Sequence, residues 1–176
     1  MNGRTKKRTT LLSMAVGAVT MIMLAVPTAA NANPSPLPFG GPFTWHNGNS
    51  DLCLEIPGSS TTMGTVAAQW ECNGTYTQQW FYMDAWDGFG KIVNVNSGMC
   101  LEPYGTADGA VVRQWQCDDS QEQKWVVYTA PSGGGWKMYS VDAGLKALEI
   151  RHDSKEWGAQ ANIWTSNSSA TQRWWL

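Results

Sequence analysis

Short apolar runs separated by polar turns dominate the chain after residue 32. Three of these runs are rich in β-branched and aromatic side chains, as β-strands are: residues 91–95, 125–128 and 136–141. Turn-forming pairs such as Asn47-Gly48, Pro57-Gly58 and Asp108-Gly109 recur between such runs. No long amphipathic helical pattern follows residue 32. We therefore predict an all-β fold built from short strands.

A Gln-x-Trp triplet occurs three times, at offsets of 45 and 49 residues: Gln78-Gln79-Trp80, Gln123-Lys124-Trp125 and Gln172-Arg173-Trp174. Other residues repeat in step with it. A second Trp precedes each triplet Trp by ten residues, a Gly precedes that Trp by six, and an x-Leu-Glu segment lies further upstream, at residues 53–55, 100–102 and 147–149. A repeat of this length indicates three copies of one structural unit. The units cover about 43–86, 87–132 and 133–176.

The first 32 residues have the pattern of an export signal. A basic start precedes an apolar stretch of 16 residues, 11–26, and Ala30-Asn31-Ala32 forms a small-x-small cleavage site. The apolar stretch is shorter than the roughly 20 residues that span a bilayer. We therefore predict cleavage after Ala32 and a secreted, extracellular product without membrane insertion. Residues 33–42 contain four prolines and are expected to form an extended tether.

Charge and length narrow the function classes. Removal of the predicted signal would take away four of the 12 basic residues and none of the 14 acidic ones, which leaves a net charge of about −6. Such a charge argues against nucleic acid and anionic membrane as partners. The remaining 144 residues suffice for one domain with a core, which we expect to be a monomer.

The four cysteines lie as two pairs, each within one unit and at matching places. Export and an even count favour disulfides Cys53–Cys72 and Cys100–Cys117. The third unit has Ala147 and Ser166 at these places. A metal site is the rival interpretation, and it is disfavoured because the chain has no Cys-x-x-Cys and only two histidines. We predict no metal and no cofactor.

These repeats closely resemble the ricin B-type (QxW) lectin domain, and the resemblance covers about residues 43–176. It implies a β-trefoil in which each unit supplies about four short strands. The first and last strands of the units form a barrel, hairpins cap it, and pseudo-three-fold symmetry relates the units. The leader and small size are also similar in style to secreted carbohydrate-binding proteins of actinobacteria.

The resemblance also implies a sugar site in each unit. In this family an aromatic ring stacks on a pyranose, while a carboxylate and an amide bind hydroxyl groups at the edge of the ring. The matching residues are the aromatics Trp70, Trp115 and Trp164, the carboxylates Glu55, Glu102 and Glu149, the amide-position residues Thr77, Glu122 and Thr171, and the adjacent glutamines Gln78, Gln123 and Gln172. In the third unit, Asn162 lies two places before the Trp.

The sequence departs from the family pattern. Glu replaces the usual Asp in all three units, and no unit has the usual Asn before its Gln. In the second unit Glu102 and Glu122 would bring two carboxylates to one site, where they repel each other. We therefore expect the first and third units to be the better sites.

The favoured function is a secreted, non-catalytic lectin with up to three shallow sugar sites that binds glycan or polysaccharide multivalently. The alternative is a degenerate trefoil that binds protein, as an inhibitor or as a subunit of an exported assembly. Exposed rings at Trp70 and Trp164 would favour sugar, and buried rings would favour protein. We predict no catalytic residues, because three units fill the domain and neither histidine lies in a recognisable triad motif.

Overall fold

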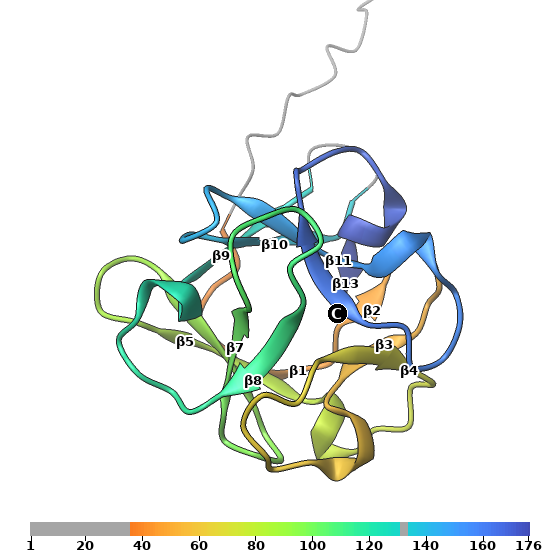
Figure 1. Ribbon diagram of the computed structural model, residues 1–176, viewed down its shortest axis with the longest axis horizontal. Coiled ribbons are helices and arrows are strands. Elements are labelled where there is room, and N and C mark those ends of the chain that lie inside the picture. The colour runs from red at the N-terminus through yellow and green to blue at the C-terminus, as the bar shows by residue number, and fades with distance from the viewer. Residues whose placement is uncertain (1–35, 131–133) are drawn as a thin grey trace, which may run out of the picture. The chain divides into compact units, whose positions relative to one another are not determined.

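The computed structural model of the chain describes residues 36–130 and 134–176, and its described elements are almost entirely β (Figure 1). The strands are β1 Gly40–Phe43, β2 His46–Asn47, β3 Cys53–Glu55, β4 Ala68–Trp70, β5 Trp80–Asp84, β6 Gly90–Asn94, β7 Cys100–Pro103, β8 Val112–Trp115, β9 Trp125–Thr129, β10 Trp136–Ser140, β11 Lys146–Ile150, β12 Ala161–Trp164 and β13 Trp174–Trp175. Five 3-10 turns accompany them: η1 Pro57–Ser59, η2 Tyr76–Gln78, η3 Gln121–Gln123, η4 Arg151–Asp153 and η5 Ala170–Gln172. The predicted all-β class is confirmed.

Strand pairing follows the three units. Between units, β5 pairs with β6, β9 with β10 and β13 with β2. Within each unit, the first strand pairs with the last, through the partners Phe43↔Trp80, Gly90↔Trp125 and Trp136↔Trp174. These strands close a barrel, and the hairpins β3–β4, β7–β8 and β11–β12 complete the units. Figure 1 shows the units arranged around one centre, as the predicted β-trefoil requires.

The Trp of each triplet belongs to the core. Trp80, Trp125 and Trp174 are fully buried. Each indole Nε1 donates a hydrogen bond of 2.9–3.2 Å to a backbone carbonyl in its own unit, at Leu54, Leu101 or Leu148. A buried indole therefore gains both packing and a partner for its N–H. The triplet repeats because the core needs the same side chain three times.

Both predicted disulfides are present, Cys53–Cys72 and Cys100–Cys117. The third unit, which lacks the cysteines, has a buried lysine at this place. The Nζ atom of Lys137 donates hydrogen bonds to the Oγ of Ser166 and to the carbonyl oxygen of Asn167. The lysine thus ties β10 to the segment that a disulfide holds in the other units.

The predicted signal over residues 1–32 lies outside the described residues, as do residues 33–35. The rest of the predicted tether packs on the domain instead of standing free. Pro36 bridges to Tyr128, Leu37 is buried in the core, and β1 pairs with β5. The physical reason is that this segment buries the side chain of Leu37 in the core and forms backbone hydrogen bonds with the edge of β5. Over the described residues, no helix has the length and apolar character needed to cross a bilayer.

Candidate functional site

In each unit the repeated Glu is held by the Gln of the triplet. The Gln Nε2 donates to the Glu Oε2 at 3.0, 3.1 and 2.8 Å in the pairs Gln78–Glu55, Gln123–Glu102 and Gln172–Glu149. The Oε1 atom of each Gln accepts a bond from the backbone N–H five residues earlier, at 2.9 Å in all units. The Nε2 atom also donates to the carbonyl seven residues earlier. The glutamines are fully buried, so they orient the carboxylate and the preceding loop but do not reach solvent.

The three carboxylates lie just beneath the surface. Glu55, Glu102 and Glu149 are 6%, 6% and 8% exposed. Burial raises the pKa of Glu55 and of Glu149, and the hydrogen bond from the triplet Gln opposes that rise in each case. A carboxylate at this depth gives a strong hydrogen-bond acceptor to a ligand hydroxyl that replaces its remaining water.

The sugar-site tryptophans of the first and third units are open to solvent. Trp70 is 37% exposed and Trp164 is 42% exposed. These side chains are therefore accessible for stacking, unlike the core tryptophans of the triplets.

Each of these rings lies against the repeated Gly of another unit. Trp70 lies by Gly158, Trp115 by Gly64 and Trp164 by Gly109, and a Cβ built on the glycine would sit 3.5–3.6 Å from the ring. All three glycines have a left-handed backbone, with φ between 78° and 86°, which favours glycine. The backbone N–H of each glycine donates a hydrogen bond of 2.8–2.9 Å to the carbonyl oxygen of the residue just before the Trp that it contacts. Each site therefore joins a hairpin of one unit to a turn of another.

The third unit has a pocket of about 210 Å³ at its site. Its lining residues are Glu149, His152, Asp153, Trp164, Asn167 and Ser169. The turn η4 brings His152 and Asp153 to the rim with φ of 59° and 51°. Asp153 is fixed by a 2.9 Å hydrogen bond from the Oγ of Ser169. The pocket thus combines one exposed aromatic ring with a buried carboxylate and a polar rim.

Asn162 does not face this pocket as a ligand amide would. Its side chain is 1% exposed, and its Nδ2 donates to the Oε1 of Glu149 at 3.4 Å and to the carbonyl of Ile163 at 3.2 Å. The amide therefore supports Glu149 from behind. Its Oδ1 is buried without a hydrogen-bond partner among the described residues.

In the second unit, Arg113 fills the site. Its Nε and Nη2 atoms lie 3.0 and 2.9 Å from the Oε1 of Glu102. Its guanidinium lies over two rings, 4.2 Å from the centroids of Tyr104 and of Trp115. Arginine thus takes both the carboxylate and the aromatic face that a sugar would use. Glu122 is exposed, and the partner of Glu102 is Arg113. The expectation that this unit is the weakest site stays a prediction, for which Arg113 offers a physical reason besides repulsion between Glu102 and Glu122.

In the first unit, Trp70 forms an aromatic pair with Trp157. The ring centroids are 5.3 Å apart with planes tilted by 42°, and Trp157 is 55% exposed. The neighbouring position two before the Trp is the small, buried Ala68. Trp157 belongs to the third unit in sequence, so offsets within one unit do not find it. The signal that could have found it is its place directly before the repeated Gly158.

The amide-position threonines serve the fold. The Oγ1 of Thr171 accepts from the N–H of Ile150 at 3.1 Å and donates to its carbonyl at 3.0 Å. The hydroxyl of Thr77 lies 2.7 Å from that of Thr75. Thr171 is 1% and Thr77 6% exposed, and both hydroxyls have partners within the protein.

One group of side chains in the described part of the chain has the spacing of metal ligands: His46, Cys53 and Cys72. Both sulfur atoms are used in the disulfide, so no thiolate is present to bind a metal. We assign no metal or cofactor role to this group.

Comparisons with known proteins agree with the β-trefoil fold described above. A family model for the ricin-type beta-trefoil lectin domain matches residues 42–174. Among solved structures, the designed three-fold symmetric protein ThreeFoil is 28% identical with a TM-score of 0.71, and the match covers 75% of this chain and 94% of that one.

Two further structures show the same fold. An exo-beta-1,3-galactanase from Clostridium thermocellum is 30% identical with a TM-score of 0.71, and the match covers 76% of this chain but only 29% of the enzyme. The Macrolepiota procera ricin B-like lectin, solved in complex with lactose, is 14% identical with a TM-score of 0.69, and the match covers 80% of this chain and 97% of the lectin. A search among curated protein sequences finds no match.

Proposed function

We propose, from the premise that the chain belongs to the ricin-type β-trefoil lectin family, that it is a secreted, non-catalytic lectin with two working sugar sites. These sites lie in the first and third units, and the second unit is closed by its own arginine. Family membership supports carbohydrate binding in general, and the number and quality of the sites come from the geometry of this chain.

The observation that carries the proposal is the pocket of the third unit. Trp164 offers an exposed ring at its wall, and Glu149 lies at the same pocket as a buried acceptor. The apolar C–H face of a pyranose would stack on the ring, while a ring hydroxyl would donate to the carboxylate. Around them, His152, Asn167 and Ser169 supply further polar partners.

The first unit offers a wider surface. The rings of Trp70 and Trp157 lie next to each other with their planes tilted by 42°, and Trp70 stands on the strand that pairs with the strand of Glu55. A single pyranose covers about one indole, so a face of two indoles suits consecutive sugar units of a chain. We therefore propose polysaccharide as the ligand of this site, bound together with the third-unit pocket.

The alternative of a protein-binding trefoil is less favoured. It predicted buried rings at Trp70 and Trp164, and both rings are open to solvent. The likeness to the galactanase adds no catalytic claim, because the match covers 29% of that enzyme. The two disulfides and the lectin domain are consistent with an extracellular location.

The test is a glycan array combined with pull-down on chitin, xylan, cellulose and cell walls, read with tryptophan fluorescence. We expect binding to at least one of them, and its loss in the double variant Trp70→Ala/Trp164→Ala. The matched control is Trp86→Ala, which removes a 91% exposed indole outside the sites. Silence of the unmodified protein on every surface would reject the lectin assignment. Unfolding of the double variant would show instead that the two rings hold the fold.

A further inference from the structure

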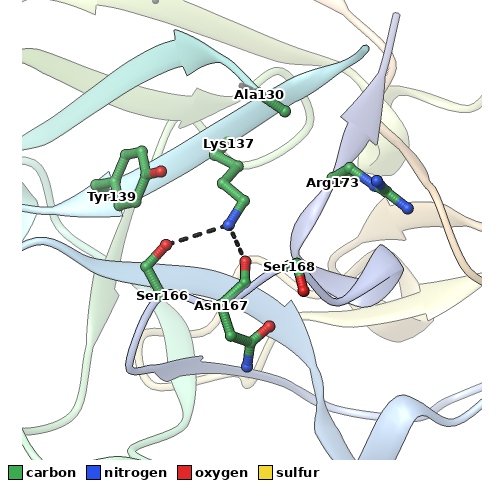
Figure 2. A pocket seen from close by; sticks show the side chains of 7 residues that line it. All are labelled: Ala130, Lys137, Tyr139, Ser166, Asn167, Ser168 and Arg173. Carbon is green, nitrogen blue, oxygen red and sulfur yellow. Dashed lines mark hydrogen bonds between the residues drawn. The ribbon is translucent and has the colours of Figure 1, made fainter. Parts of the chain in front are cut away.

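A second pocket lies in the third unit, next to the sugar pocket. Its volume is about 230 Å³, and it is lined by Ala130, Lys137, Tyr139, Ser166, Asn167, Ser168 and Arg173 (Figure 2). Asn167 lines both pockets. None of the described lining residues is acidic, and two of them are cations.

The charge of Lys137 is buried without a counter-charge in the described part of the chain. The side chain is 5% exposed, and its Nζ donates to the Oγ of Ser166 at 3.1 Å, to the Oε1 of Gln172 at 3.3 Å and to the carbonyl oxygen of Asn167. All three acceptors are neutral. Burial lowers the pKa of Lys137, and the positive charge of Arg173 lowers it further. The lowered pKa agrees with the contacts of this ammonium group, all three of which are with neutral oxygens.

In the second unit, the lysine at the matching position has an acidic partner. Lys91 is the equivalent of Lys137. Each lysine lies three places before the residue that pairs with the triplet Trp of the preceding unit, and these pairs are Asn94↔Trp80 and Ser140↔Trp125. The Nζ of Lys91 contacts the Oδ1 of Asp119 at 3.1 Å.

Asp119 has a counterpart in the third unit. It lies two places after Cys117, and the residue two places after the matching Ser166 is Ser168. The third unit therefore keeps the cation and replaces its carboxylate partner by a hydroxyl, which leaves room for an external anion.

Hydroxyl groups complete the pocket. Because the Oγ of Ser166 accepts from Lys137, its own hydrogen is available to a ligand. Tyr139 and Ser168 add two further hydroxyls at the wall, and Arg173 lies across the pocket from Tyr139 (Figure 2). Hydroxyl donors beside a buried ammonium group suit the oxygens of an anionic group, and the guanidinium of Arg173, which Figure 2 shows directed away from Lys137, adds positive charge at the rim. The net charge of about −6 expected after removal of the signal does not oppose this, because charges beyond about 8 Å are screened at physiological salt.

We infer that this pocket binds an oxyanion, namely the carboxylate or sulfate substituent of an acidic glycan whose neighbouring neutral sugar occupies the Trp164 pocket. The shared residue Asn167 places the two pockets side by side. The anion site itself stands apart from the proposed lectin function, and only the glycan as carrier of the anion rests on it.

The test uses sodium sulfate and sodium glucuronate as probes, with glucose as the neutral control, at constant ionic strength in sodium chloride. Backbone amide NMR shifts of residues 166–168 report binding. We expect saturable shifts with at least one anion and none with glucose at these residues. A response to sulfate alone identifies a sulfate ester, and a response to glucuronate alone identifies a uronate; each supports the inference.

Two variants and a matched control sharpen this test. Ser168→Asp gives the third unit the acid of the second and should weaken anion binding at least tenfold while the fold is kept. Lys137→Met should do the same, and Lys91→Met in the second unit should leave anion binding unchanged. No saturable shift with either anion up to about 100 mM, or full binding in Ser168→Asp, overturns the inference.

The failure of the lectin proposal would look different. In that case sulfate or glucuronate would still shift residues 166–168, while no neutral or acidic glycan would bind in a manner that depends on Trp164.

Discussion

At the scale of single residues, we propose that one position governs access to each candidate site. The residue two places before the sugar-site Trp is Ala68, Arg113 or Asn162, and all three occupy matching places in the hairpins. Alanine leaves the carboxylate and ring free, asparagine supports the carboxylate, and arginine covers both. The guanidinium is an effective plug because it pairs with Glu102 and stacks on two rings at once.

We predict that Arg113→Ala opens a third sugar site. Removal of the guanidinium exposes the face of Trp115 and frees Glu102 to accept a hydroxyl. The same change leaves a buried carboxylate without its cation, so we expect a loss of about 1–3 kcal/mol in the free energy of unfolding. NMR titration with the sugar that binds best should show new shifts around Trp115. Lys155→Ala, at an exposed lysine, is the control, and absence of new shifts in a folded Arg113→Ala variant would contradict the plug.

Glu149 should make sugar binding dependent on pH. Its pKa is raised above 4.5 by burial, so it becomes protonated as pH falls through this raised value and ceases to be a charged acceptor. Sugar binding at the Trp164 site should therefore weaken on acidification, beginning above pH 4.5. Fluorescence titration across pH measures this, and unchanged affinity through the acidic range would contradict it.

The effect on stability has the opposite sign. A carboxyl whose folded pKa is raised stabilises the fold most below its unfolded pKa, and that contribution is lost as pH rises through the folded pKa. Glu149→Gln should therefore keep or increase stability at pH 7 while it weakens sugar binding. Glu122→Gln, at an exposed glutamate, should change neither.

At the scale of elements, the third unit has no disulfide, and its Lys137 contacts Ser166, the residue at the place of the second cysteine. Ala147 pairs with Trp164 in the same way that Cys53 pairs with Trp70 and Cys100 with Trp115. From this pairing we expect the third hairpin to have the geometry that a disulfide needs, with Lys137 hydrogen-bonded to Ser166 and Asn167 beside it.

Ala147→Cys/Ser166→Cys should therefore form a third disulfide. The loop would be similar in length to those of the native bridges, which enclose separations of 19 and 17 residues. Such a loop contributes about 3 kcal/mol, from which about 1 kcal/mol is lost with the Lys137–Ser166 hydrogen bond. Mass spectrometry would detect the bond, and urea unfolding would measure the gain. Free thiols in the folded, oxidised variant would contradict the equivalence of the three hairpins.

The repeated residues of the three units show how much of the fold could be predicted from the sequence. The buried Trp of each triplet, the Leu of each x-Leu-Glu segment and both cysteine pairs recur at fixed offsets, and these positions predicted the trefoil and its disulfides correctly. They recur because the core of each unit has the same shape, so each unit needs the same side chains.

The sites themselves were harder to predict. Trp157 reaches Trp70 only because a turn of the third unit packs on a hairpin of the first, and no offset within one unit contains that contact. The closure by Arg113 depends on the conformation of its side chain. The hydrogen bond from Lys137 to Ser166 depends on a serine that stands where the other two units have a cysteine. The first feature follows from packing between units, and the other two follow from residues in which one unit differs from the others. A repeat pattern describes only what the units share.

At the scale of the whole molecule, the pseudo-three-fold arrangement puts the hairpins of the two proposed sites, β3–β4 and β11–β12, on different units of one barrel (Figure 1). A polymer that engages both sites gains from effective concentration, since the second contact is made within one complex. A soluble monosaccharide has no such gain. The two kinds of ligand should therefore respond differently when one site is removed.

We predict that Trp70→Ala and Trp164→Ala, taken singly, each leave one monosaccharide site at its original affinity but weaken binding to an insoluble polysaccharide by about 10² or more. Removing one ring deletes one contact, and with it the effective concentration that the other site supplies. Depletion assays on the polysaccharide, with soluble monosaccharide titrations beside them, separate the two effects. Trp86→Ala should behave as the unmodified protein. If either single variant binds the polymer as tightly as the unmodified protein does, the two sites do not act together, and the arrangement on the trefoil contributes nothing to affinity.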